Sequence, residues 1–307
     1  MEKIKFEIEP EMEGVRLDKC IAVWKEDISR SYIQKLIEQG NVTLNGICVK
    51  AKTLPKTGDV VEVLLPEPIG LTIPPEPIPL SILYEDDDVI LINKPKGMVV
   101  HPAAGHYTGT LVNGLLYHCG ESLSGINGVL RPGIVHRIDM DTTGVLVVCK
   151  NDKAHQSLAE QLKVHSITRK YEAIVCHAFK EENGTVNAPI GRHAIERTKM
   201  AVNLKNGKNA ITHYKVLKNL GKDYAHIECQ LETGRTHQIR VHMSHIGHPL
   251  VGDTTYGAKK QPFQLQGQTL HAKVLGFIHP TLGTYMEFEA PLPEYFVTLR
   301  NKLDKNL

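Results

Sequence analysis

The sequence predicts an α+β protein in which a small α+β module precedes a larger domain built around a mixed, mainly antiparallel sheet. Beyond Leu80, helical and strand patterns mix without the regular strand–helix alternation that a parallel sheet requires. Residues 66–79 contain six prolines, and proline at that density disfavours both helix and central strand. We therefore divide the chain into a module at 14–65, a linker at 66–79 and a domain at 80–307.

The module at 14–65 is expected to contain two helices, a hairpin and a final strand. Apolar residues recur at helical spacing over 17–24 and over 33–37, and Gly40 suits the end of the second helix. The Asn45-Gly46 pair lies between two short β-type runs, which is the strongest short signal for a hairpin. The module therefore predicts helix, helix, hairpin and strand in that order.

The larger domain is read from its apolar runs and its turn residues. The apolar run at 145–148 has strand length and predicts a strand buried on both faces. The other expected elements are strands at 89–92, 170–175 and 224–232, helices at 111–117 and 154–162, an exposed basic hairpin within 180–210, a loop entering a helix at 231–242, and two late strands that end near Phe277 and Phe288.

The composition limits the class of protein. The 307 residues include 36 Lys and Arg against 34 Asp and Glu, so the formal net charge is +2 and a nucleic-acid partner would have to be bound by local basic patches. No apolar stretch approaches membrane-spanning length, the N-terminus lacks the apolar core of a signal peptide, and the six cysteines form no Cys-x-x-Cys pair. We expect a cytoplasmic monomer with free thiols and no membrane contact.

A local excess of basic residues lies in the first module. Between residues 15 and 56, eight basic residues outnumber four acidic ones. This excess indicates a surface that faces phosphate groups, although an ordinary solvated face explains the charge equally well. The order of elements, however, resembles the alpha-L RNA-binding motif of the ribosomal protein S-four type. That resemblance implies RNA binding, and the candidate RNA-binding residues here are Arg16, Arg30, Lys35 and Lys50.

A run of ionisable side chains lies directly before the predicted buried strand. It contains His136, Arg137, Asp139 and Asp141. A reactive group on a loop that a rigid strand supports is typical of catalytic sites. A structural turn explains the same residue types, because Asp and Thr form local turns and Gly supplies a positive φ. A calcium loop does not fit, because its twelfth position requires Glu and is Lys150.

Two further kinds of site were weighed. Four histidines between 237 and 248 suggest a metal site, but no Cys or helix-borne carboxylate joins them, and Arg235 and Arg240 would repel a cation. Asp139 and Asp141 could act as the paired acids of a carboxylate glycosidase. A single Asp without a metal can serve as nucleophile or proton acceptor, and a neighbouring Arg keeps it ionised.

Five motifs, in order, resemble the RluA/RluD family of pseudouridine synthases. The segment His-Arg-Ile-Asp-Met-Asp-Thr-Thr-Gly at 136–144 is similar to the catalytic motif of that family. The segment 101–118 is most similar to the RluD branch, which acts on large-subunit ribosomal RNA. The other four motifs are Asn-Lys-Pro-Lys-Gly at 93–97, Lys-Tyr-Glu-Ala at 170–173, Thr-Gly-Arg-Thr-His-Gln-Ile-Arg-Val-His at 233–242 and Gly-Asp-Thr-Thr-Tyr-Gly at 252–257.

The resemblance implies roles for single residues. Asp139 is implied to be the catalytic carboxylate, a choice over Asp141 that spacing alone could not make. Arg235 is implied to pair with Asp139. Tyr171 is implied to stack on the uracil and is a candidate for proton transfer, and Arg137 is implied to help hold the flipped-out nucleotide.

The resemblance also implies an activity and a partner. The expected reaction is the isomerisation of uridine to pseudouridine in RNA, above all in large-subunit (23S) ribosomal RNA. No redox change occurs, so we expect no cofactor, and we expect no metal. The alternative is a non-catalytic RNA-binding or ribosome-assembly factor on the same fold, which replacement of Asp139, Tyr171 or Arg235 would indicate. None of the three is replaced.

Overall fold

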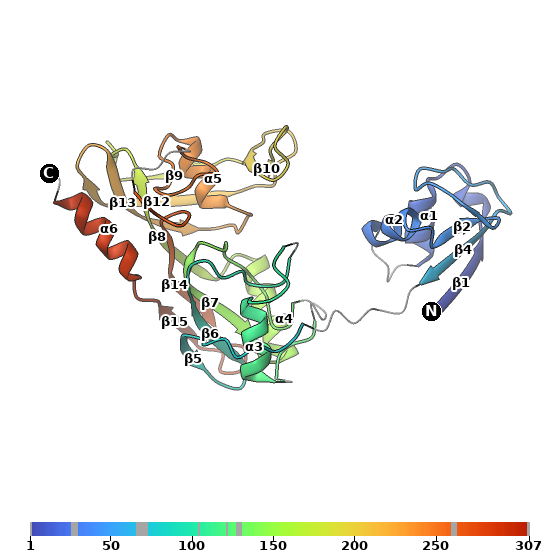
Figure 1. Ribbon diagram of the computed structural model, residues 1–307, viewed down its shortest axis with the longest axis horizontal. Coiled ribbons are helices and arrows are strands. Elements are labelled where there is room, and N and C mark those ends of the chain that lie inside the picture. The colour runs from blue at the N-terminus through green and yellow to red at the C-terminus, as the bar shows by residue number, and fades with distance from the viewer. Residues whose placement is uncertain are drawn as a thin grey trace. The chain divides into compact units, whose positions relative to one another are not determined.

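The chain folds into two compact units, Met1–Leu71 and Thr72–Leu307, which are described separately (Figure 1). No helix in the described part of the chain is long and apolar enough to cross a membrane. The computed structural model describes residues 2–25, 30–65, 73–103, 105–120, 122–126, 131–258 and 263–305.

The first unit contains a four-stranded antiparallel sheet in the order β1-β4-β2-β3. β1 pairs with β4 along its whole length, so the unit begins well before the predicted limit at residue 14. The predicted hairpin is confirmed, with positive φ at Asn45 and Gly46 as a tight two-residue turn requires. The elements are β1 (Glu2–Glu7), the 3₁₀ turn η1 (Pro10–Met12), α1 (Leu17–Trp24), α2 (Arg30–Glu38), β2 (Val42–Leu44), β3 (Ile47–Cys48) and β4 (Val60–Leu65).

The second unit is organised by one nine-stranded sheet. Its order is β5-β6-β7-β14-β8-β13-β12-β9, and β15 pairs with β14. The β7–β14 pair is parallel and the other pairs are antiparallel, which confirms the predicted mixed, mainly antiparallel sheet. The strands are β5 (Ile82–Glu85), β6 (Val89–Lys94), β7 (Thr143–Cys149), β8 (Thr168–Cys176), β9 (Asn183–Asn187), β12 (Ile211–Leu220), β13 (Tyr224–Leu231), β14 (Leu270–Ile278) and β15 (Tyr285–Glu289).

In the described part of this unit, helices accompany the sheet (Figure 1). They are α3 (Leu111–Cys119), α4 (Asp152–Lys163), α5 (Gln238–His245) and α6 (Glu294–Asp304). The sequence reading omits β5, β12 and α6. The apolar residues of α6, Phe296, Leu299 and Leu303, complete a separate small core with Ile174 and Leu220.

The segment predicted as one exposed basic hairpin at 180–210 is more complex. β9 joins the edge of the main sheet, and only β10 (Ile190–Arg192) and β11 (Met200–Val202) form a separate two-stranded hairpin. The backbone hydrogen bonds that β9 makes with β12 account for the difference, because a long-range pairing is not visible in local residue patterns.

The predicted linker is too long at its C-terminal end. Ile73 is buried in the core of the second unit, and the Asn113 side chain donates to the Pro74 carbonyl across 2.9 Å. Gly114 of α3 leaves room for this segment, since a Cβ there would lie 3.2 Å from the Ile78 side chain. Residues 73–79 therefore belong to the second unit rather than to a free linker. Residues 66–72 lie outside the described ranges.

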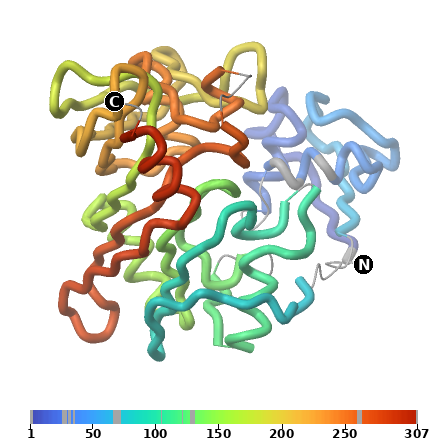
Figure 2. The backbone as a smooth tube through the Cα atoms, turned by 60° about the vertical axis from the view of Figure 1, so that its left-hand side comes forward, coloured from blue at the N-terminus to red at the C-terminus, as the bar shows by residue number. Residues whose placement is uncertain are grey.

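The strand β7 is buried at every position, as predicted for the apolar run at 145–148. It runs beside β14, and Figure 2 shows this late, orange-red part of the chain against the earlier green strands. A Cβ at Gly144 would collide with the Ala272 backbone, so glycine is required for this close approach. The segment before β7 is thereby fixed against the centre of the sheet.

Candidate active site

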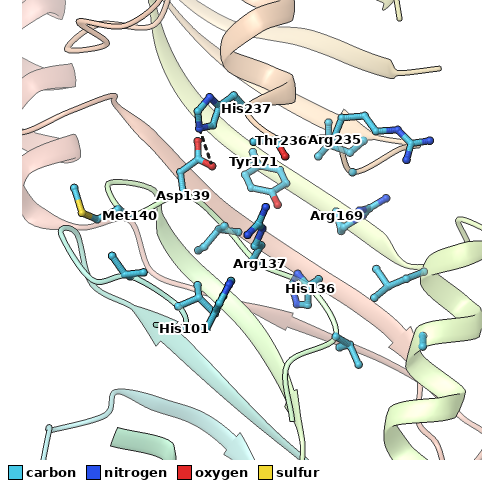
Figure 3. Close-up of a pocket in the computed structure, with 18 of the residues that line it drawn as sticks. His101, His136, Arg137, Asp139, Met140, Arg169, Tyr171, Arg235, Thr236 and His237 are labelled. Atoms are coloured by element: carbon cyan, nitrogen blue, oxygen red, sulfur yellow. Dashed lines mark ion pairs between the residues drawn. The ribbon is translucent and has the colours of Figure 1, made fainter. Parts of the chain in front are cut away.

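A cavity of about 780 Å³ opens in front of β7 and β8 (Figure 3). It lies between the segment that leads into β7, the strand β8 and the loop that leads into α5. Three predicted functional residues from different parts of the chain, Asp139, Tyr171 and Arg235, line it together with Arg137. The fold thus gathers the separate sequence motifs around one cavity.

Asp139 sits in a turn at the mouth of β7. The Thr142 N–H donates to the Asp139 carbonyl across 3.0 Å, which closes the turn. The carboxylate Oδ2 accepts from Arg240 Nη1 at 2.9 Å, and Oδ1 lies 3.9 Å from His237 Nε2. Among the described residues that line the cavity, Asp139 is the one with a carboxylate.

Asp141 is separated from Asp139 by the same turn and does not line the cavity. Its Oδ1 accepts from the Gln266 side chain at 3.4 Å, and its carboxylate packs against Gly267. Two acids that are equivalent by spacing therefore face different surroundings. A glycosidase-like pair of acids across one bond does not fit this arrangement.

Arg240 is held by a second carboxylate, that of the fully buried Asp253. Its Nε and Nη2 donate to the two oxygens of Asp253 at 2.6 and 3.0 Å. Burial lowers the pKa of Arg240, but the hydrogen bonds and charge of Asp253, together with Asp139, raise it well above its ordinary value. The motif at 252–257 thus supplies the residue that holds the guanidinium beside Asp139.

The predicted ion pair between Arg235 and Asp139 is wrong. Arg235 Nε donates to the Asn209 carbonyl at 2.9 Å, and Figure 3 shows its guanidinium directed away from Asp139. The reason is local backbone geometry. His237 has a φ of +57° and α5 begins directly after it, so Arg235 stays on the preceding loop while Arg240 faces the cavity from the helix.

Tyr171 forms one wall of the cavity and is 8% exposed. Burial raises the pKa of the phenol, with Asp139 acting in the same direction and Arg169 opposing them. The phenol is therefore protonated near neutral pH. Apolar side chains of Leu231, Ile239 and Leu270 line a smaller adjoining cavity beside this ring, together with Asp139 and Arg240. The apolar side suits a flat aromatic ring.

His136 has a structural role rather than that of a proton carrier. Its Nε2 accepts a hydrogen bond from the Val147 N–H at 3.2 Å. Burial and the nearby Arg169 lower the pKa of His136 to about 3, so the ring is neutral at physiological pH. His136 thus links the segment that precedes β7 to the strand itself.

Lys94 is a functional support that the sequence reading does not identify. Its side chain is completely buried, and its Nζ donates to the carbonyls of Pro95, Met98 and Met140 at 2.9, 2.9 and 2.8 Å. Burial lowers the pKa of Lys94 to about 7, against the opposing charges of Asp141 and Asp139. Lys94 thus ties the motif at 93–97 to the residue that follows Asp139.

The histidines of the 237–248 segment are used separately. His237 Nδ1 bonds to the Tyr256 hydroxyl at 2.7 Å, whereas His242 contacts the Thr212 hydroxyl and the Ala188 carbonyl, both at 2.9 Å. They form no shared metal-binding cluster. Elsewhere in the described chain, one group of three possible ligands occurs, Glu85, His118 and Cys119, and Lys150 already pairs with Glu85 at 2.8 Å.

The predicted RNA-binding residues of the first unit are partly engaged within it. The buried Asp18 carboxylate accepts from Arg16 Nε at 3.0 Å, from Arg30 Nη2 at 2.8 Å and from Gln34 at 2.6 Å. Both arginine side chains remain more than 40% exposed. Lys50 is exposed, and the Lys35 side chain lies outside the described part of the structure.

Comparison with known proteins shows which families and relatives this chain resembles. Residues 88–245 match the model of the RNA pseudouridylate synthase family, and residues 15–61 match the S4 domain. The chain is 53% identical to the uncharacterized RNA pseudouridine synthase YlyB of Bacillus subtilis, over the whole of both chains. It is 49% identical to the ribosomal large subunit pseudouridine synthase D of Zymomonas mobilis, with 92% of each chain covered.

A solved structure has a similar fold over much of the chain. Human RNA pseudouridylate synthase domain containing 1 matches with a TM-score of 0.57 and 26% identity, over 75% of this chain and 96% of that one. The family match covers the segment that carries Asp139, Tyr171 and Arg240. The chain therefore belongs to the RNA pseudouridylate synthase family, as an RNA pseudouridine synthase with an N-terminal S4 domain.

Proposed function

We propose that the protein converts specific uridines of large-subunit ribosomal RNA to pseudouridine, with Asp139 as the catalytic carboxylate. Relatives at 44% and 49% identity are named ribosomal large subunit pseudouridine synthase D, which supports this choice of RNA. The observation that carries the proposal is the position of Asp139, the carboxylate of a cavity whose wall is an aromatic ring.

The reaction breaks the bond between uracil N1 and ribose C1′ and forms a bond between C5 and the same C1′. The proton on C5 is lost and N1 gains one, so the atoms balance without an oxidant or reductant. The reacting carbon must come within reach of Asp139, which lies inside the cavity. The uridine therefore leaves its stack in the RNA, at a cost of a few kcal/mol, and stacks on Tyr171.

Arg240 takes the role that the sequence reading assigns to Arg235. Its guanidinium donates to the Asp139 carboxylate and fixes the orientation of that group, because Asp253 holds the guanidinium in place. Arg235 and Arg137 remain candidates for contact with the RNA, since both line the cavity without a carboxylate partner in the described chain.

The test compares two isosteric variants on adjacent acids. Asp139→Asn should fold and bind RNA but form no pseudouridine in a uridine-containing hairpin under single-turnover conditions. Asp141→Asn should keep most of the activity, because its carboxylate lies outside the cavity. Pseudouridine formation by Asp139→Asn at the wild-type rate would refute the mechanism.

The substrate is tested separately from the mechanism. Mapping pseudouridines in ribosomal RNA from cells that lack this gene should reveal missing large-subunit sites, and the wild-type gene should restore them while Asp139→Asn should not. A complete set of large-subunit sites in the deletion strain would exclude that substrate. If Asp139→Asn restored growth or assembly without the modification, the alternative of a non-catalytic RNA-binding factor would be correct.

A further inference from the structure

The cavity has an inner and an outer part with different chemistry. The smaller part next to Asp139 and Tyr171, which we call the inner part, has Leu231, Ile239 and Leu270 on its apolar side. Asp139 and Arg240 are among its polar lining residues, and it suits a pyrimidine ring. The outer part extends along the end of α4, where Lys163 and His165 line it, and includes Arg169 in its wall. Arg169 is absent from the lining of the inner part. A base alone would leave this outer part unfilled.

Arg169 is a buried cation for which the described residues provide no anionic partner. Its side chain is 6% exposed, and Nη2 donates to the Glu232 carbonyl at 3.0 Å. The Nε–H is buried and has no hydrogen-bond acceptor in the described structure. No carboxylate of the described residues lies within ion-pair distance of it, whereas Arg240, equally buried, is held by two.

Such a cation is costly to bury unless an anion accompanies it. Burial lowers the pKa of Arg169, Tyr171 acts in the opposite direction, and the nearby Arg235 lowers the pKa further. Its position is nevertheless closely fitted. A Cβ on Gly234 would lie 2.5 Å from Arg169 Nη1, so glycine at this position of the motif leaves space for the guanidinium.

The strand β8 sets the relation of Arg169 to the base site. Arg169 and Tyr171 are two residues apart on one strand, so their side chains emerge on the same face, about 7 Å apart along it. Figure 3 shows Arg169 and Arg235 on one side of the Tyr171 ring, and Asp139 with His237 on the other. The cations therefore lie on the side of the ring away from the reacting carboxylate.

We propose that Arg169 binds a backbone phosphate of the RNA strand next to the flipped uridine, with Arg235 beside it. The inference rests on the proposed function, since it takes the strand to enter through the outer part of the cavity. A phosphodiester supplies the missing anion, and a guanidinium suits its oxygens geometrically. The contact would fix the position of the RNA strand along the cavity, so that one nucleotide lies next to Asp139.

The first experiment measures RNA affinity against salt for the full-length protein. Arg169→Met should weaken binding of a short target RNA by roughly ten- to a hundredfold. It should also make the log–log salt dependence shallower by about 0.7 to 0.9, the value of one phosphate contact. The single-turnover rate at saturating RNA should also fall, though less than the affinity does, because a strand without this contact presents the uridine to Asp139 less often.

Two variants control for structure. Lys163→Met removes an exposed cation of the same cavity that already pairs with Glu160 at 2.9 Å, so it should change the salt slope less. Arg169→Lys keeps the positive charge but loses the planar guanidinium that can donate two parallel hydrogen bonds. Its salt dependence of binding should be close to that of the wild type. If Arg169→Lys gives the slope of Arg169→Met, a structural role through the Glu232 carbonyl replaces the phosphate contact.

The second experiment locates the phosphate. Single linkages on either side of the target uridine are replaced in turn by uncharged methylphosphonates. One replacement should weaken wild-type binding and have no further effect on Arg169→Met, a coupling that identifies the contacted linkage. Additive losses at every linkage would overturn the proposal.

One further result would give Arg169 a different role, and another would give the protein a different function. A slower reaction at saturation with unchanged affinity would place Arg169 on the departing uracil and reject the phosphate contact. Failure of the wild type to form pseudouridine, with the linkage coupling intact, would refute the proposed function and leave the phosphate site standing. The two ideas can therefore fail independently.

Discussion

Asp139 and Asp253 share one guanidinium, that of Arg240. Nη1 donates to Asp139 at 2.9 Å, while Nε and Nη2 hold Asp253 at 2.6 and 3.0 Å. Asp253 also accepts the backbone N–H groups of Thr255 and Tyr256, so its own position is fixed by a turn. A partly exposed carboxylate is thus oriented by a buried acid that never meets the cavity.

Arg240→Met should be far more damaging than Arg235→Met. It removes a buried charge shared by two carboxylates and leaves the buried Asp253 carboxylate without a cation. The substitution should lower the free energy of unfolding by about 3–5 kcal/mol and abolish most of the activity. Arg235→Met removes one hydrogen bond to a carbonyl and should cost about 1 kcal/mol. Urea unfolding and single-turnover pseudouridine formation measure both effects, and equal losses from the two variants would contradict the assignment.

A double-mutant cycle tests the Asp139–Arg240 contact directly. Asp139→Asn combined with Arg240→Met should lose less stability than the sum of the two single variants. In the double variant, neither charge of the Asp139–Arg240 pair remains without its partner. The matched cycle with Arg235→Met should be additive. Coupling in the Arg235 cycle without coupling in the Arg240 cycle would restore the pairing predicted from the sequence.

Lys94→Met should loosen the catalytic turn without touching the cavity. Methionine fills similar space but leaves three carbonyls unpaired, so we expect a loss of stability of about 2–4 kcal/mol and a reduced reaction rate at saturating RNA. Lys96→Met is the control. Lys96 Nζ lies over the Tyr295 ring, 3.9 Å from its centroid, and has no hydrogen-bond acceptor in the described structure. A smaller effect of Lys94→Met than of Lys96→Met would contradict this role.

The stability of the first unit should depend on acid through Asp18. Burial raises the pKa of Asp18, but hydrogen bonds from Arg16, Gln34 and Arg30 bring it well below its usual range. A carboxyl with a lower pKa when folded stabilises the fold above the unfolded pKa of about 3.9, and this contribution is lost as the pH falls towards the folded value. We therefore expect declining stability below about pH 4.

Trp24 provides the measurement, because it is the single tryptophan of the chain and stacks on Phe6 with ring centroids 4.2 Å apart. Thermal unfolding followed by its fluorescence should show Asp18→Asn to be less stable than the wild type at neutral pH, by about 1–3 kcal/mol, since the arginines are half exposed. The difference should narrow below about pH 4. If the difference in stability between Asp18→Asn and the wild type does not depend on pH, the ionised contacts of Asp18 with its arginines are excluded as its cause.

Truncation tests where the second unit begins. A fragment starting at Thr72 should keep its fold, whereas one starting at Leu80 loses the buried Ile73 and the Asn113–Pro74 hydrogen bond. Burying one such side chain is worth about 1.5–3 kcal/mol, so the shorter fragment should melt at a lower temperature. Circular dichroism compares the two, and equal melting temperatures would show that residues 73–79 do not stabilise this unit.

The sequence by itself determined the family and most of the elements. The Asn45-Gly46 turn and the apolar run at 145–148 are local signals, and their strands form as predicted because turn geometry and burial depend on neighbouring residues. Five ordered motifs were enough to indicate an RNA pseudouridine synthase, which the family match confirms. The strand β12 and the helix α6 were not predicted, because they are stabilised by packing against segments that are distant in the sequence.

Only the tertiary structure decided which residues act on one another. Arg235 and Arg240 lie in one motif, and the positive φ of His237 decides which of them reaches Asp139. Asp253 holds that arginine from another motif. Arg169, two residues before Tyr171, has no sequence feature that reveals its missing counter-ion. Ion pairs and buried charges depend on distance and exclusion of water, and these quantities exist only once distant segments have packed together.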